Sequence, residues 1–302
     1  MASKPRNSIN YGEFTITLLI RTAGYISVLF VLLISLFLIR EAVPAFIKIP
    51  ADSLFNTRWY PIEGMYGILP LLTGSLTITI GASLIAIPLG LLTAVYISEI
   101  APPWTKEILK PLVEILAGIP SVVLGFLGIL VLSPFLRETF NLPTGLTALT
   151  GSILLGWAAI PTIVSVSEDA LNTVPASYRE ASLALGCTRW QTIWGVAVPS
   201  ARSGIITAIM LGVGRVIGET MTVMMVTGNA PTMPDGLRTI ILPIRTMTAT
   251  IASEMGEVAN GSDHYQVLFL IGLILFIFSL VINVIAFQIS SRRIKRSERL
   301  LS

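Results

Sequence analysis

The chain has 302 residues, of which 53% are hydrophobic and only 12% are charged. Soluble domains contain about 25% charged residues, so this composition excludes an ordinary soluble protein and predicts one that lies in a membrane. The net charge of +3 is too small to indicate a nucleic-acid-binding protein. The single cysteine, Cys187, excludes an internal disulfide, and the single histidine, His264, provides no metal-binding cluster.

Six apolar segments are long enough to cross a bilayer, for which a helix needs about 20 residues. They cover residues 17–39, 68–98, 108–136, 146–168, 203–228 and 265–290. We therefore expect an all-α membrane protein with six transmembrane helices. Pro88 in the second segment, Pro111 and Pro120 in the third, and Pro161 in the fourth predict helices that are interrupted inside the membrane.

Lysine and arginine residues predict the direction of the crossings, because they concentrate on the inner side of a membrane. With the N-terminus inside, the inner segments carry Lys4, Arg6, Lys106, Lys110, Arg179, Arg189, Arg202, Arg292, Arg293, Lys295, Arg296 and Arg299. The outer segments carry only Arg40, Lys48, Arg58, Arg137, Arg238 and Arg245. Both termini and residues 169–202 are therefore expected inside, with residues 40–67 and 229–264 outside. On the inner side, Lys110 is predicted to pair with Glu114, one helical turn away.

Residues 167–202 form a polar segment between the fourth and fifth spans. Pro175 suits the first turn of a helix, and Gly186 suits the position after its end, where a left-handed backbone conformation is common. Thr188 and Gln191 have the spacing of a capping box, which predicts a second short helix. The segment is therefore predicted to form a compact knob of two helices at the membrane surface.

The spacing within this segment resembles the EAA loop of the permease subunits of ABC importers. Glu180-Ala181-Ser182 is followed after three residues by Gly186, and after nine more by Val196-Ala197-Val198-Pro199. The resemblance implies a type-1 ABC importer permease fold, in which this loop docks into a separate ATPase chain. The residues implied in the docking loop are Arg179, Glu180, Ala181, Gly186 and Arg189. The alternative is a loop that has no partner.

The chain shows no nucleotide-binding motif of its own. The dipeptide Gly-Lys, which the phosphate-binding loop of ATPases contains, never occurs. We therefore expect a transport subunit and not an enzyme, with no catalytic site, no metal site and no cofactor bound by this chain. The resemblance implies that ATP is used by the partner ATPase.

Arg215 and Glu219 lie inside the fifth apolar segment. A charged side chain inside a span costs a few kcal/mol and normally faces a cavity or a partner. Because the two residues are four positions apart, we expect them on one face of a helix. Gly212, Gly214 and Gly218 would let other backbones approach that face closely. The alternative is that the two charges neutralise each other between packed helices.

The string Gly-Arg-Val-Ile-Gly-Glu-Thr-Met, from Gly214 to Met221, resembles the PstC-type permeases of phosphate importers, as do residues 117–126 and 178–190. The resemblance implies that Arg215, Glu219 and Thr220 lie on a phosphate pathway across a bacterial or archaeal inner membrane. It implies a PstA-like second permease, two PstB-like ATPase subunits and a PstS-like external phosphate-binding protein as partners. It divides the chain into an N-terminal part (1–67), a permease core (68–290) and a basic tail (291–302).

Other functions remain open from the sequence. A PstA-like sister subunit shares the Arg-x-x-x-Glu spacing, and a permease for another oxyanion would look similar. An ion-coupled secondary transporter also places charges on broken helices, but it needs no EAA loop and usually contains an internal repeat, which we do not find. A membrane scaffold would leave Arg215 and Glu219 unexplained.

Overall fold

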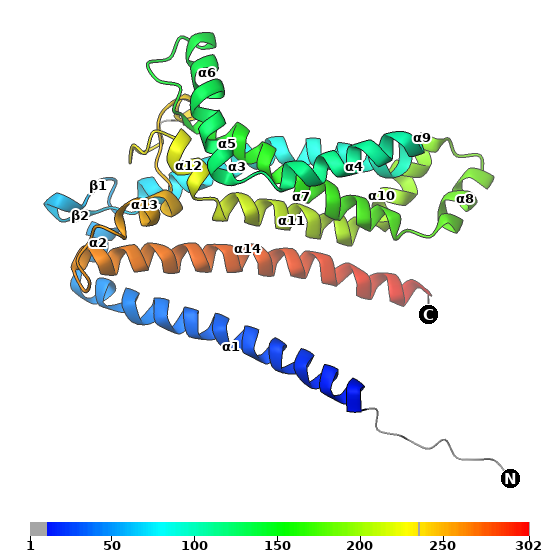
Figure 1. Ribbon diagram of the computed structural model, residues 1–302, viewed down its shortest axis with the longest axis horizontal. Coiled ribbons are helices and arrows are strands. Elements are labelled where there is room, and N and C mark those ends of the chain that lie inside the picture. Colours follow the sequence, from blue (N-terminus) through cyan, green and yellow to red (C-terminus); the bar gives the residue numbers. More distant parts are fainter. Residues whose placement is uncertain (1–10, 235, 302) are drawn as a thin grey trace.

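Figure 1 presents the chain as a computed structural model, in which residues 11–234 and 236–301 are described. Apart from one short hairpin and the connecting loops, the described chain is helical. The helices are α1 (Tyr11–Lys48), α2 (Ala51–Leu54), α3 (Leu69–Val95), α4 (Pro103–Ala117), α5 (Ser121–Leu127), α6 (Ser133–Thr139), α7 (Ala148–Asn172), α8 (Ala176–Ala184), α9 (Arg189–Thr192), α10 (Val198–Ser200), α11 (Arg202–Gly218), α12 (Met221–Val226), α13 (Met247–Glu254) and α14 (Asp263–Leu301). Strands β1 (Trp59–Tyr60) and β2 (Met65–Tyr66) pair in antiparallel fashion, with Trp59 opposite Tyr66.

Short irregular helices complete these elements. Single π-helical turns at Tyr96–Ile100, Gly128–Leu132 and Ile193–Ala197 continue α3, α5 and α9, and 3-10 turns lie at Pro61–Glu63 and Gly236–Ile241. The all-α class is thus confirmed for the described part of the chain.

The expectation of six crossings agrees with the apolar helices that the structure contains. Among the described residues, five helices are long and apolar enough to cross a membrane alone: Thr15–Lys48, Leu69–Ile100, Ser121–Thr139, Ala148–Asn172 and Asp263–Ile285. A sixth crossing results if Arg189–Ser200 and Arg202–Gly218, which meet at a 72° bend, are taken together. The basic tail is the last part of α14 and not a separate segment, whereas Lys4 and Arg6 lie outside the described residues.

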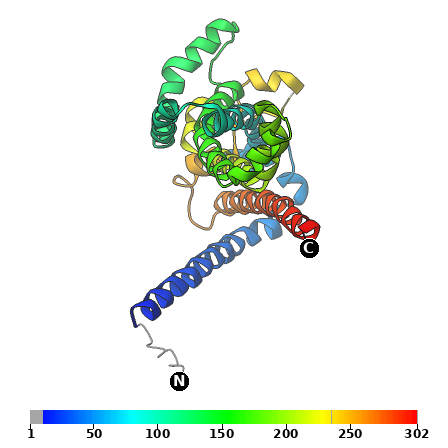
Figure 2. The same ribbon diagram turned by 90° about the vertical axis from the view of Figure 1, so that its right-hand side faces the viewer.

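The third and fifth spans are broken, and the proline pattern predicts only one of the breaks. The third span ends as α4 at Ala117 and restarts as α5 at Ser121, directly after Pro120. Pro88, Pro111 and Pro161 were expected to interrupt their helices, and this expectation is wrong, since each lies inside a continuous helix. The loss of a single hydrogen bond at a proline is tolerated where neighbouring helices hold the segment in place. Beyond α5, α6 lies across the direction of the long helices (Figures 1 and 2).

The centre of the molecule is a bundle of α3, α7 and α11, flanked by α4 (Figures 1 and 2). Small residues let these helices pack closely: a Cβ atom added to Gly90 of α3 or to Gly212 of α11 would lie 2.8 Å or 2.5 Å from the side chain of Ile163 on α7. Helix α14 lies along the bundle, and α1 lies on the outer side of α14 and diverges from it towards Tyr11. Most side chains of α1 are exposed and apolar, as expected for a helix in lipid.

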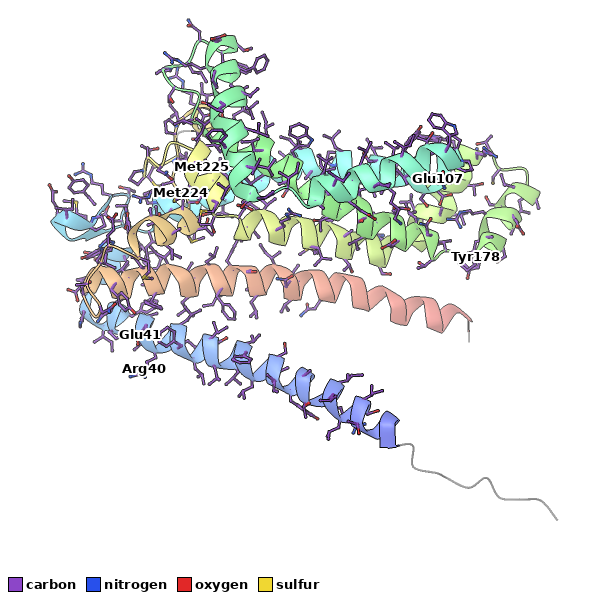
Figure 3. All side chains as sticks on the ribbon, viewed as in Figure 1. Arg40, Glu41, Glu107, Tyr178, Met224 and Met225 are labelled. Carbon is purple, nitrogen blue, oxygen red and sulfur yellow. The ribbon has the colours of Figure 1, made fainter. Side chains whose placement is uncertain are left out.

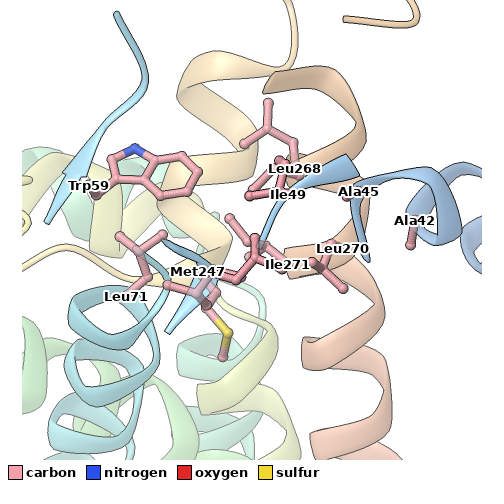
Figure 4. Close-up of a cluster of buried hydrophobic side chains, with 12 residues drawn as sticks. Ala42, Ala45, Ile49, Trp59, Leu71, Met247, Leu268, Leu270 and Ile271 are labelled. Carbon is pink, nitrogen blue, oxygen red and sulfur yellow. The ribbon is translucent and has the colours of Figure 1, made fainter. Parts of the chain in front are cut away.

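The two ends of the bundle differ. One, here called the knob end, carries α8–α10 together with the start of α1 and the end of α14 (Figure 1). The other, the hairpin end, carries β1, β2 and α13 around a buried apolar cluster (Figure 4), whose labelled members are Ala42, Ala45, Ile49, Trp59, Leu71, Met247, Leu268, Leu270 and Ile271. Glu254 fixes this end, because its carboxylate lies 2.7 Å from Arg245 and 2.8 Å from His264 and accepts a 3.2 Å hydrogen bond from the Trp59 indole.

Candidate functional site

The knob has the helix ends that the sequence predicts. Helix α8 ends at Ala184, and Gly186, directly after the C-cap residue Leu185, has a φ angle of +86°, in the left-handed region that favours glycine. The Gly186 N–H donates to the Leu183 carbonyl at 2.9 Å, and the Cys187 N–H donates to the Ser182 carbonyl at 3.2 Å. These two bonds form a Schellman motif, which satisfies carbonyl groups at the end of α8. The predicted capping box of Thr188 and Gln191 is also present and starts α9.

A hydroxyl pair joins the two helices of the knob. The hydroxyl groups of Ser182 and Thr192, both buried, lie 3.0 Å apart. Ser182 stands where the EAA pattern has alanine, so this departure from the pattern adds a link between α8 and α9. On the outside, the knob exposes Leu185 at 85% and Trp190 at 58%, and Tyr178 lies near its tip (Figure 3). Exposed apolar groups of this size outside a membrane indicate a protein contact.

The five residues implied in the docking loop divide into two groups. Glu180, Ala181, Gly186 and Arg189 are exposed. Arg179 points back towards the bundle, where its guanidinium pairs with Glu99 and donates to the carbonyl groups of Leu171, in the last turn of α7, and Val174, just after it. The hydrogen bond to Glu99 raises the pKa of Arg179, against the opposing effect of burial. Sequence reasoning missed Glu99, because no local pattern links two residues that lie 80 positions apart.

The second candidate region is a break in the fifth span. Helix α11 ends at Gly218, Glu219 has an extended backbone (φ −71°, ψ 129°), and α12 begins at Met221. The expectation that Arg215 and Glu219 share one helix face is therefore wrong, because the four-residue spacing assumes a helix that continues between them. The Arg215 guanidinium donates to the Thr162 hydroxyl on α7 at 3.2 Å. No ion pair joins Arg215 to Glu219 in the described part of the chain.

Each charge lies beside the helix end that favours it. Arg215 is in the last turn of α11, where the backbone carbonyl groups carry partial negative charge. The Glu219 carboxylate precedes α12 and accepts hydrogen bonds from the Thr222 N–H and hydroxyl, both at 3.3 Å. The predicted alternative, direct neutralisation between packed helices, is therefore not the arrangement found. Arg215 compensates the partial negative charge at the end of α11, and Glu219 binds the free N–H group at the start of α12, while the two side chains remain separate from each other.

Three helix starts meet at this break. The Thr222 hydroxyl donates to the Ser121 carbonyl at the start of α5, at 2.9 Å. The Thr248 hydroxyl, in the first turn of α13, donates to the Glu219 carbonyl at 3.0 Å. The breaks in the third and fifth spans are thus joined to each other and to the hairpin end. Thr222 and Thr248, both buried, were missed by sequence reasoning, although the hydroxyl-rich run Thr246–Thr250 gives a signal.

The surroundings of Arg215 are open on one side. Of the three glycines predicted to allow close packing, only Gly212 does so, against Ile163. A Cβ atom added to Gly214 or Gly218 would find no atom within 4 Å. Arg215, Glu219 and Thr220 are each partly exposed. An anion or another chain could therefore reach this break from the open side, whereas no group of three or more His, Cys, Asp or Glu side chains that could hold a metal occurs among the described residues.

Comparisons with known proteins identify the family of this chain. Residues 86–296 match the family described as "Binding-protein-dependent transport system inner membrane component". A probable ABC transporter permease protein, YqgH of Bacillus subtilis, is 42% identical over 246 residues, which cover 81% of this chain and 79% of that protein. The phosphate transport system permease protein PstC of Xylella fastidiosa is 34% identical over 263 residues, with the same two coverages.

Solved structures share the fold at low sequence identity. A chain of the MetNI methionine ABC transporter in an inward-facing conformation superimposes with a TM-score of 0.58 at 20% identity, covering 77% of this chain and 98% of that chain. A chain of a bacterial alginate ABC transporter gives a TM-score of 0.62 at 14% identity, covering 94% and 97%. The predicted type-1 ABC importer permease fold is therefore confirmed.

Proposed function

Since this chain belongs to the family of binding-protein-dependent transport system inner membrane components, we propose that it is the PstC-like permease of an ATP-driven phosphate importer. The observation that carries the phosphate assignment is Arg215, a partly exposed guanidinium with an open side at a break in a membrane span. Arginine presents several fixed donors to a tetrahedral oxyanion and stays charged at physiological pH. Relatives that share more than 30% of its sequence carry the name PstC.

A second permease completes this pathway in the proposal. Arg215 and Glu219 lie partly exposed at the surface of the single chain, and exposure of such charges to lipid would cost about 3 kcal/mol each. Helix α5, which contacts α12, also exposes Val122 and Phe126, and the π-helical turn that follows it exposes Leu130. A PstA-like chain that covers this region would keep lipid away from the charges and enclose a polar path.

The knob docks into one of two PstB-like ATPase subunits, through its exposed residues Glu180, Gly186 and Arg189 and the apolar groups beside them. A PstS-like protein delivers phosphate at the hairpin end. The chain itself supplies the path and the contact with the ATPase, and ATP is bound and hydrolysed by the partner.

The function is tested by uptake into vesicles that contain the assembled complex. We expect ATP-dependent uptake of phosphate that sulfate does not compete away. Glu219→Gln should lower phosphate uptake several-fold without loss of folding, because the amide oxygen can still accept the hydrogen bonds from Thr222 while the acceptor for a protonated phosphate oxygen is weakened. Preferred uptake of sulfate would point to a permease for another oxyanion. Uptake without any ATPase would point to an ion-coupled transporter.

The orientation is proposed from the basic residues, with both termini and the knob in the cytoplasm. Cys187, the only cysteine, is partly exposed in the knob and reports on this orientation. A thiol reagent that cannot cross membranes should leave Cys187 unlabelled in intact cells and label it in opened cells that lack the ATPase subunit. Labelling of Cys187 in intact cells would reverse the proposed orientation.

A further inference from the structure

Arg179 is the connection between α8 and the bundle. Its Nε and one terminal nitrogen bind the two carboxylate oxygens of Glu99, at 3.0 Å and 2.5 Å, in the paired geometry that suits a guanidinium and a carboxylate. The same side chain donates to the Val174 carbonyl at 2.7 Å and to the Leu171 carbonyl at 3.0 Å. One residue of the knob thus holds the end of α3 and the end of α7 together.

The rest of α8 contributes little to this connection. The only side chain that α8 buries is Ser182, and its hydroxyl contacts Thr192 inside the knob. The buried apolar residues of the cluster at the knob end come from α3, from α7 and Val174 just after it, and from the segment from Ile193 onward, and not from α8. The Arg179–Glu99 pair is therefore the side-chain contact that links α8 to the end of α3.

The burial of Glu99 makes its ion pair with Arg179 necessary for the stability of this end of α3. Its side chain is only 8% exposed, in the π-helical turn Tyr96–Ile100 that ends α3. A buried carboxylate without a partner is strongly unfavourable, so the pair holds firmly once it has formed. A π-helical turn inserted in a helix often marks a functional position.

Further polar contacts join the end of α3 to the end of α7, and the end of α7 to α4. Ser98, next to Glu99, donates to Asn172 at 3.0 Å, and the Asn172 amide donates to Glu168 at 3.3 Å. The Glu168 carboxylate also forms an ion pair with Lys110 of α4, at 3.4 Å. The predicted pairing of Lys110 with Glu114 is therefore wrong, since the better-placed partner lies on α7 and not one turn along α4. A displacement of Arg179 would reach α3, α7 and α4 through these contacts.

We propose that Glu99 is a positioning residue for coupling: through Arg179 it ties the knob to α3, so that movement of the knob by the ATPase moves the membrane helices. This inference rests on the proposed contact between the knob and an ATPase. Without Glu99, α8 would still present its exposed surface to the ATPase, but part of each movement would be lost between α8 and α3.

The test compares phosphate transported per ATP hydrolysed in vesicles that contain the whole complex. Glu99→Gln is expected to keep ATP hydrolysis within about twofold of wild type and to lower the transported phosphate per ATP by roughly threefold or more. A purely structural loss would lower both rates together and leave their ratio unchanged. The matched control is Glu107→Gln, since Glu107 is an exposed glutamate on α4 at the same end (Figure 3).

Two further measurements make the result decisive. In the double variant Glu99→Gln, Arg179→Gln the ratio should fall no further than in Glu99→Gln, because both changes remove the same contact. A spin label on Cys187 of the permease should become more mobile in Glu99→Gln and in the milder Glu99→Asp, but not in Glu107→Gln. The label needs neither substrate nor ATPase, so it tests the Arg179–Glu99 link between α8 and α3 even if the proposed function fails. An unchanged ratio in assembled Glu99→Gln, or unchanged label mobility in both Glu99 variants, would overturn the inference.

Discussion

Replacement of Arg215 by glutamine is expected to abolish phosphate uptake while the permease still assembles with its partners. Glutamine keeps much of the length of the side chain and can still contact the Thr162 hydroxyl, but it removes the positive charge and most of the donors. An anion would then face the carboxylate of Glu219 without a compensating cation. Uptake, ATP hydrolysis and the yield of the complex should be measured on the same preparation.

Two further variants separate the charge of Arg215 from its position. Arg215→Lys keeps the charge and loses the planar fork, so partial uptake is expected. Thr162→Val removes only the 3.2 Å hydrogen bond that orients the guanidinium, which is worth about 1 kcal/mol, and should reduce uptake by about fivefold. Wild-type uptake by Arg215→Gln would remove this residue from the pathway. A complex that no longer assembles would instead give Arg215 a role in helix packing.

Replacement of Gly186 by valine is expected to leave the permease in the membrane and to detach or uncouple the ATPase. The φ angle of +86° is unfavourable for a β-branched residue, at a cost of about 1–2 kcal/mol or more. No atom lies within 4 Å of an added Cβ, so the effect arises from the backbone and not from a collision. The end of α8 would rearrange, and the exposed surface of α8 would change its orientation relative to α9.

Asparagine provides the matched control for Gly186, because it tolerates the left-handed conformation much better than valine does. Gly186→Asn should therefore retain most of the transport and of the co-purified ATPase that Gly186→Val loses. If Gly186→Asn and Gly186→Val lose transport and the co-purified ATPase to the same extent, the defect lies in the docking surface and not in the backbone. Normal transport by a stably assembled Gly186→Val complex would contradict the role given to this residue.

Features that depend on neighbouring residues in the chain could be predicted from the sequence. The apolar segments predict the crossings because about 20 apolar residues in a row have few other stable environments. Gly186 and the Thr188–Gln191 capping box were predicted correctly because helix ends are determined within a few residues. The proline pattern was less informative: Pro120 marks a break, but Pro161 lies in a continuous helix, because packing against neighbouring helices decides whether a lost hydrogen bond matters.

The contacts between distant segments were decided only by the tertiary structure. By itself the sequence determined that this protein has membrane-crossing helices, a knob of two short helices, and two charged residues within the fifth span. The fold decided that Arg215 binds Thr162, that Thr222 binds the Ser121 carbonyl, and that Arg179 turns inward to Glu99. Periodicity and spacing describe one helix at a time, whereas each of these partners is chosen by which helices pack side by side and by which buried charges must then be compensated.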